Sequence, residues 1–115
     1  RKDYDFSIES VESALKTNQE GIVRVTVENT GNNRIYNATL TISCTTPLQS
    51  DPEAMSAYLG DLNVNGEANA EFKIHVMEGA LNASYPAKLI LKFRTSDDIT
   101  KMLSKPVGLK VSDVK

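Results

Sequence analysis

The chain has 115 residues, which suits one domain with a single hydrophobic core. Its composition, 40% hydrophobic and 24% charged, is ordinary for a folded protein. The formal net charge is −2 and the lysines and arginines are scattered, so the basic face that nucleic-acid binding requires is missing from the sequence.

Three further features of the chain bear on its covalent structure, its relation to a membrane and its place in a longer polypeptide. The single cysteine, Cys44, excludes an intrachain disulfide. No apolar run approaches the ~20 residues of a membrane-spanning helix, so we expect no direct insertion into a membrane. Because the chain opens on Arg1 rather than methionine, we expect residues 1–115 to be one domain cut from a larger polypeptide.

The first predicted strand is Tyr4–Glu9, where apolar and polar residues alternate. We expect it to continue after a kink through Val11 to Leu15. A helix over Val11–Thr17 is the alternative, but seven residues are too few for a helix that is stable alone. A turn at Lys16–Gly21 follows.

Two alternating strands joined by a polar turn form the most informative segment, Ile22–Ser43. The valines at 23, 25 and 27 share one face of the first strand. After the turn at Asn29–Asn33, every second residue from Tyr36 to Ile42 is predicted to point inward. A sheet with one apolar and one polar face needs a second sheet to cover the apolar one.

The middle of the chain predicts a polar loop at Pro47–Pro52, because proline lacks the N–H of a central strand. A short strand over Met55–Leu62 is expected next. One helical turn within Asp51–Leu59 is the alternative, since Asp followed by Pro suits a helix start. The turn at Asn63–Gly66 leads to a regularly alternating strand, Ala68–Val76.

The last third predicts a strand over Tyr85–Arg94, a tight turn at Ser96–Asp98, a segment Ile99–Leu103 and a closing strand Val107–Val111. We therefore expect seven strands at intervals of about 8–14 residues, which is typical of a two-sheet antiparallel β-sandwich.

Four segments, in this order and spacing, resemble the Ig-like modules of prokaryotic cell-surface proteins. They read V-T-V-E-N-T-G, Y-L-G-D-L, A-E-F-K-I-H-V and Y-P-A-K-L-I-L-K-F, at Val25–Gly31, Tyr58–Leu62, Ala70–Val76 and Tyr85–Phe93. The chain resembles in particular the archaeal S-layer-related repeat domains and the CARDB type, the cell-adhesion-related domain of bacteria and archaea. The likeness extends over nearly the whole chain.

This resemblance implies an all-β, seven-stranded antiparallel Ig-like (Greek-key) sandwich, repeated in large extracellular or envelope-anchored polypeptides. It implies adhesion, spacing or ligand display, with no catalysis and no cofactor. The implied partners are other domains of the same polypeptide, cell-surface proteins and glycans. Tyr85 fits the structural tyrosine corner of such sandwiches.

These modules often carry a D-G turn before the last strand, whereas this chain has Ser96–Asp98, so a longer final hairpin or a bulge is expected.

Candidate catalytic and metal sites receive little support from the sequence. His75 lies on a strand face expected to be solvated and Cys44 on a buried face, so we do not expect them to form a dyad. Asp97 and Asp98 suit a turn better than a pair of glycosidase carboxylates. With Asp51 they form at most a loose calcium site, and because the EF-hand spacing is absent we assign no metal.

Two surface features remain as candidates. The sequons at Asn37 (N-A-T) and Asn82 (N-A-S) are possible glycosylation sites if the protein is secreted. Ile90 lies on the predicted solvent face between Lys88 and Lys92, and this face is the first candidate for a protein contact if neighbouring strands extend it.

Together these observations predict a non-catalytic structural or adhesion module of a cell-surface or secreted prokaryotic protein, archaeal by its resemblance. An accessory substrate- or carbohydrate-binding domain of a secreted hydrolase ranks lower. Such domains use exposed aromatic residues, whereas this chain has no tryptophan and its tyrosines and phenylalanines are mostly predicted to point inward. A third hypothesis is an intracellular scaffold.

Overall fold

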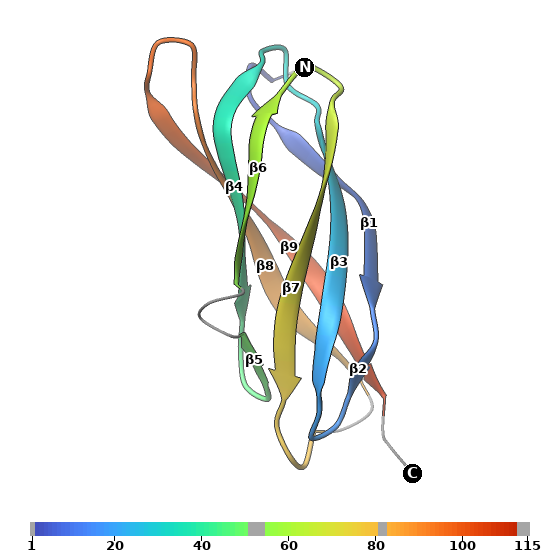
Figure 1. Ribbon diagram of the computed structural model, residues 1–115. Helices are drawn as coiled ribbons and strands as arrows, with labels where there is room; N and C mark the ends of the chain where they lie inside the picture. Colours follow the sequence, from blue (N-terminus) through green and yellow to red (C-terminus); the bar gives the residue numbers. More distant parts are fainter. Residues whose placement is uncertain (1, 51–54, 81–82, 113–115) are drawn as a thin grey trace.

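The computed structural model describes residues 2–50, 55–80 and 83–112, which form two β-sheets packed face to face (Figure 1). The strands are β1 (Phe6–Ser13), β2 (Leu15–Lys16), β3 (Glu20–Asn29), β4 (Ile35–Cys44), β5 (Leu48–Ser50), β6 (Ser56–Leu62), β7 (Glu67–Val76), β8 (Ala83–Arg94) and β9 (Thr100–Ser112). Sheet A has the order β1-β3-β7-β5, and sheet B has the order β2-β9-β8-β4-β6. The predicted all-β sandwich is therefore confirmed.

The predicted count of seven strands, all antiparallel, is wrong. The first strand continues past a register shift between Ile8 and Ser10, as expected for a kink, but it ends at Ser13. The chain then leaves sheet A, and Leu15 belongs to a strand of sheet B. There β2 pairs in parallel with the end of β9, which makes sheet B mixed. The helical alternative for this segment is also wrong.

The predicted loop after Pro47 contains the second additional strand. Leu48–Ser50 pairs with the end of β7, and the Met77 N–H donates to the carbonyl of Pro47. Three residues are too few to show a periodic pattern, so the sequence did not reveal this strand. The strand predicted over Met55–Leu62 is confirmed as β6. The helical alternative fails at residues 56–59, and residues 51–54 lie outside the described part of the chain.

The core is formed by the inward residues of both sheets, and the three predicted valines of β3 are all buried. The predicted inward residues Ala38, Leu40 and Ile42 of β4 are buried, but the prediction is wrong for Tyr36, which is only partly buried while Ile35 beside it is buried. Asn37 has a positive φ of 52° and the β4 register shifts here, so a bulge inserts an extra residue into the alternation.

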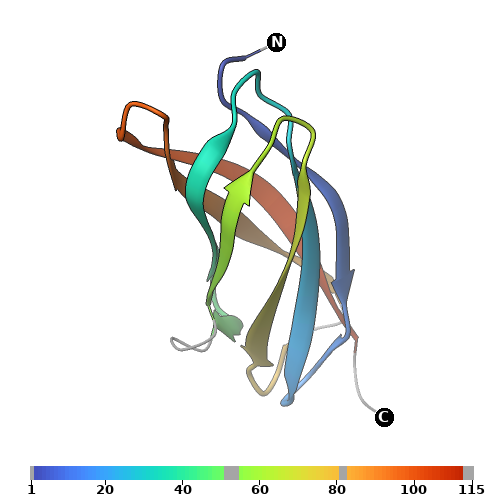
Figure 2. The same cartoon turned by 45° about the horizontal axis from the view of Figure 1, so that its top comes forward.

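β8 and β9 form one long hairpin in continuous register, from Ala83 opposite Val111 to Arg94 opposite Thr100. The two closing segments expected from the sequence are thus a single strand. Pro106 is tolerated because the other edge of β9 is paired only at Val111 and Ser112, which leaves this proline on a free edge. The tip of the hairpin stands away from the rest of the sandwich (Figures 1 and 2).

Asn29 is a fully buried polar residue at the end of β3. Its side-chain amide donates to the carbonyls of Asn33 (2.9 Å) and Leu62 (3.2 Å), and its side-chain oxygen accepts from the Gly31 N–H (3.1 Å). The side chain therefore joins the β3–β4 turn to the end of β6. All its hydrogen-bonding groups are used, as burial requires.

Two lysines of β9 cover the side of the core between β1 and β9. The Lys101 ammonium lies 5.7 Å from the centre of the Tyr4 ring, and the Lys105 ammonium lies 5.6 Å from that of Phe6. Lys105 also lies 3.6 Å from the Asp5 carboxylate. The aliphatic parts of such side chains shield apolar surface while the charges stay near water.

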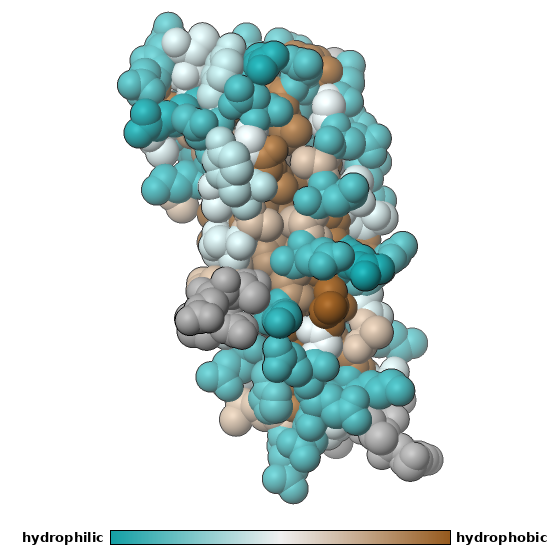
Figure 3. Space-filling view, viewed as in Figure 1, coloured by the Kyte–Doolittle hydropathy of each residue, from teal (hydrophilic) through white to brown (hydrophobic). Residues whose placement is uncertain are grey.

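The sandwich is elongated, with extents of 51 × 25 × 17 Å. The first described residues and the end of β9 lie at opposite ends of its long axis (Figure 1). From the same side, hydrophilic residues cover most of the strands, and a hydrophobic strip runs between β6 and β7 (Figure 3). Ala57 and Leu59 of β6 and Ala68 of β7 are partly buried against the core.

Candidate functional site

The structure does not bring Cys44 and His75 together as a reactive pair. Cys44 ends β4 and packs against the core from sheet B, where it is half-buried rather than fully buried as expected. Burial raises the pKa of the Cys44 thiol, which disfavours the nucleophilic thiolate. His75 is exposed on β7 of sheet A, opposite Glu20 and Gln49.

The predicted turn acids do not converge on a metal site. Asp98 binds Arg94, with 2.9 Å between carboxylate oxygen and guanidinium nitrogen, and Asp51 lies outside the described residues. Within residues 2–50, 55–80 and 83–112, no group of three or more His, Cys, Asp or Glu side chains is placed to hold a metal ion. The same residues contain no helix that could cross a bilayer.

Two further predicted residues can be placed in the structure. Tyr85 is partly buried in β8, opposite Leu109, and its role as a tyrosine corner stays a prediction. Asn37 is exposed at the β4 bulge, and Asn82 lies outside the described part of the chain.

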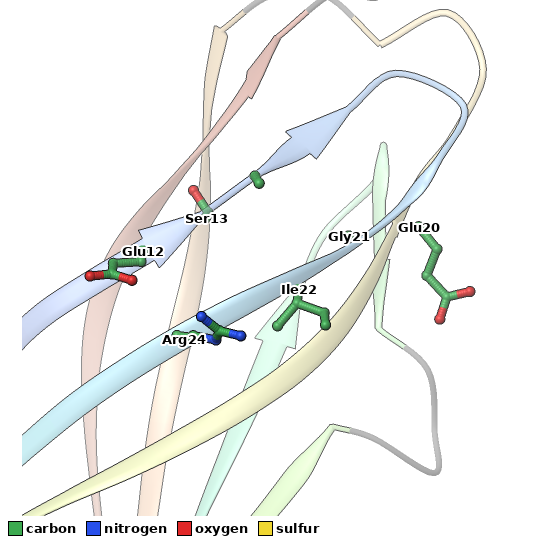
Figure 4. Close-up of a pocket in the computed structure, with 7 residues that line it drawn as sticks. Glu12, Ser13, Glu20, Gly21, Ile22 and Arg24 are labelled. Carbon is green, nitrogen blue, oxygen red and sulfur yellow. The ribbon is translucent and has the colours of Figure 1, made fainter.

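A hollow of about 580 Å³ lies where β1 ends beside β3 (Figure 4). At Gly21 an added Cβ would lie 2.7 Å from the Ala14 carbonyl oxygen, so the crossing chain forms one wall. Glu20 points away from the other labelled side chains in Figure 4, and Arg24 is paired with Glu71 at 2.9 Å. The polar groups around this hollow do not converge on a point, and we assign no ligand to it.

A polar network on β4 and β6 surrounds the bulge. Asp61 accepts a hydrogen bond from the Asn37 N–H (3.0 Å), and the Tyr58 hydroxyl donates to the Asn37 side-chain oxygen (3.0 Å). Arg34 reaches Asp61 at 3.4 Å and Asn63 at 2.6 Å. This network holds Tyr58 by its hydroxyl although the residue is 69% exposed.

Sequence reasoning missed the network and the exposure of Tyr58. A signal was available: in I-Y-N-A, Ile35 and Ala38 are three residues apart instead of two, which points to a bulge. Beside the β4 bulge lies a hollow of about 210 Å³, which is lined by Tyr36, Asn37, Arg94, Thr95, Ser96 and Asp98.

The expectation that the scattered lysines and arginines form no basic face is wrong: the outer face of sheet B is predominantly basic, and we call it the basic face. It contains Ile90 between Lys88 and Lys92, as predicted, with Thr41 and Ser104 opposite Ile90. Met102, 62% exposed, lies opposite Lys92 and extends the apolar part. The cations of this face are Lys16, Lys88, Lys92, Arg94 and Lys110. Among the described residues, the carboxylates at its margins are those of Asp61, paired with Arg34, and Asp98, paired with Arg94.

The outer face of sheet A is predominantly acidic, and we call it the acidic face. Its carboxylates are those of Glu12, Glu20, Glu28, Glu67 and Glu71, and they outnumber the cations of Arg24 and Lys73. Ile22, 42% exposed, is the apolar residue among them. The two broad surfaces of the sandwich thus carry opposite charge.

No family model matches the chain, and no curated protein matches its sequence. Solved structures share its fold. The CARDB domain of the PF1109 protein from Pyrococcus furiosus, solved with di-metal ions, is 10% identical, with TM-score 0.55 over 95% of this chain and 89% of that one. The GAE domain of GGA2p from Saccharomyces cerevisiae is 13% identical, with TM-score 0.53 over 92% of this chain and 96% of that one.

The major pilin subunit BcpA of Bacillus cereus is 12% identical, with TM-score 0.53 over 94% of this chain and 41% of the pilin. At these identities the similarity shows a shared fold. One of these structures is a domain of the CARDB type that the sequence resembles.

Proposed function

We propose that the chain is a non-catalytic structural or adhesion module of a cell-surface or secreted prokaryotic protein, archaeal by its resemblance, which acts as a spacer and interaction domain. The main support for the proposal is the position of the two ends of the described chain. They lie at opposite ends of a 51 Å sandwich, so each module placed in series adds its length to the polypeptide.

The fold and the surface of the sandwich support this proposal. A CARDB domain and a major pilin subunit share the fold. The two broad outer faces also leave the sides of each module available for contacts.

Small-angle X-ray scattering on two copies joined in series tests the spacer role. We expect the largest dimension to increase by about one module length over that of a single copy, because the ends of the chain point in opposite directions. Two copies that fold back side by side, with an unchanged largest dimension, would contradict it.

The proposed location at the cell surface has its own test. A membrane-impermeant amine reagent should label the exposed lysines on intact cells of the source organism.

Carbohydrate binding is the second candidate function, and the exposed Tyr58 favours it. Its ring is open to solvent while its hydroxyl is fixed by Asn37, and sugars stack on such rings. A glycan array probed with the native chain and with Tyr58→Ala tests this. The matched control is Ile22→Ala, on the other sheet. Binding that disappears only in Tyr58→Ala would place carbohydrate recognition above the spacer role.

Glycosylation at Asn37 and Asn82 is part of the same proposal. Asn37 is exposed, and its hydrogen bonds use the backbone N–H and the side-chain oxygen, which leaves the side-chain nitrogen available for a sugar. Intact mass measured on protein from its natural source, with peptide mapping of each sequon, tests both sites. An unmodified mass would overturn this part of the proposal.

A further inference from the structure

We infer that the basic face of one copy binds the acidic face of a second copy, so that modules stack head to tail through their broad surfaces. The inference rests on the proposed function, because it names a partner for the interaction domain. It concerns the sides of the module, whereas the spacer role concerns its ends.

Charge is the first support for this contact. On the acidic face, Glu12, Glu20 and Glu67 are exposed and form no salt bridge with any described residue. Glu67 also lies directly opposite Glu28, an arrangement of like charges that is unfavourable within one sheet. A surface bearing cations would relieve this repulsion.

The basic face presents matching unpaired cations. Lys88, Lys92 and Lys110 are exposed, and none of them forms a salt bridge with a described residue. The chain as a whole has a net charge of only −2, so the opposite charges are separated by face rather than by an overall excess of one sign. Complementary potentials of this kind steer association and fix orientation.

The two sets of charges extend over similar lengths. From Lys88 to Arg94 along β8 is six residues, or about 20 Å, and from Glu28 to Glu20 along β3 is eight residues, or about 26 Å. The sandwich is 51 Å long and 25 Å wide, which leaves room for an interface of standard size. Such an interface buries about 800 Å² on each partner.

Each face also carries an exposed apolar residue among its charges. Ile22 lies on the acidic face next to Arg24, and Met102 lies on the basic face opposite Lys92. Exposed apolar residues ringed by charges are the usual anatomy of an interface core and rim. Ile90, which is partly buried, lies diagonally across from Met102 on the same face.

The symmetry of the contact follows from the charges. A two-fold dimer would place the same face against itself and oppose like charges. Pairing unlike faces is heterologous, and it leaves one free face of each kind at the two ends of the stack. Addition of further copies is therefore open-ended.

Two triple variants of the chain test the inference. Lys88→Gln, Lys92→Gln and Lys110→Gln together neutralise the basic face, and Glu20→Gln, Glu67→Gln and Glu71→Gln together neutralise the acidic face. Circular dichroism and thermal melting first establish that both variants are folded. Sedimentation velocity then measures the mass distribution of each protein over a concentration series.

The wild-type chain should associate to growing mass in about 10 mM salt and return to monomer in about 1 M salt, where the Debye length falls from about 30 to about 3 Å. Each variant alone should stay monomeric. An equimolar mixture of the two should form dimers and nothing larger, because only one native basic face and one native acidic face remain in each pair.

Three results would overturn the inference: a wild-type chain that stays monomeric in low salt, variants that associate as the wild type does, or loss of association in the lysine variant alone. The last would mean that the basic face binds something other than the acidic face. None of these results changes the length of copies joined in series, so the proposed spacer role is judged separately.

Discussion

Two turns of the molecule, at Asn29–Asn33 and at Thr95–Ile99, look alike in sequence and are built differently. Both are short, polar segments between strands. In the first, the Asn29 side chain is buried and binds a distant strand, and residues 2–5 of the chain pass over Gly31. In the second, the contacts are local: Thr95 and Ile99 bond to each other, and Asp98 bonds to Arg94.

This difference means that one turn is part of the tertiary structure and the other closes a hairpin. A substitution in the first turn should affect the stability of the whole domain. One in the second should affect mainly the hairpin tip, which stands away from the sandwich.

Asn29→Ala should have the largest effect. It removes three side-chain hydrogen bonds and leaves buried groups without partners, so we expect a loss of about 3–5 kcal/mol in the free energy of unfolding. Urea unfolding measures it. Ser96→Ala, in the exposed second turn, is the control and should stay within about 0.5 kcal/mol of the native chain. Equal losses in the two variants would remove the distinction between the turns.

Gly31→Ala should rank second, with a loss of about 2 kcal/mol. The new Cβ would lie 2.8 Å from the carbonyl oxygen of Asp3 and from the backbone nitrogen of Asp5, and backbone atoms cannot rotate aside. Gly108→Ala is the matched control, because its Cβ meets nothing within 4 Å. Thermal melting compares the pair, and similar midpoints would show that the chain does not cross Gly31 closely.

Thr95→Ala should cost about 1 kcal/mol, because the Ile99 N–H loses the hydroxyl oxygen that accepts its hydrogen bond at 3.2 Å. Thr95→Ser keeps the hydroxyl and should recover most of the loss. Amide hydrogen exchange should show faster exchange at the hairpin tip and unchanged protection in β3. Loss of protection throughout the sandwich would contradict the local character of this turn.

Asp98→Gly should have the smallest effect, a gain of about 0.5 kcal/mol. Asp98 has a positive φ of 62°, a conformation that glycine adopts without strain, while the lost contact to Arg94 is exposed. Asp98→Ala keeps the strain and should be no more stable than the native chain, as chemical unfolding can show.

The sequence was sufficient for the elements whose pattern is local and long. Alternation in β3, β7 and β8 identified most of their buried residues, and the turn at Asn63–Gly66 is where it was expected. The sequence was insufficient where contacts between segments far apart in the chain determine the structure. Nothing near Asn29 indicates that the carbonyl of Leu62, 33 residues away, accepts its amide hydrogen.

The candidate interaction faces illustrate the same limit. That Lys88 and Lys92 point outward can be predicted from the alternation of one strand. Strand pairing decides the rest. It places Met102 of β9 on the same face as these lysines, and it places Glu67 opposite Glu28 on the other sheet. The short β5 and the crossing at Ala14 add an edge strand to each sheet, and neither has a periodic signature in the sequence.

The parallel pairing of β2 with β9 has a mechanical consequence. Leu15 and Lys16 lie beside Val111 and Ser112, and the Thr17 N–H donates to the carbonyl of Ser112 at 3.3 Å. Tension applied between the two chain ends slides these strands along each other. The hydrogen bonds between the two strands are then loaded together, in shear, instead of breaking one after another.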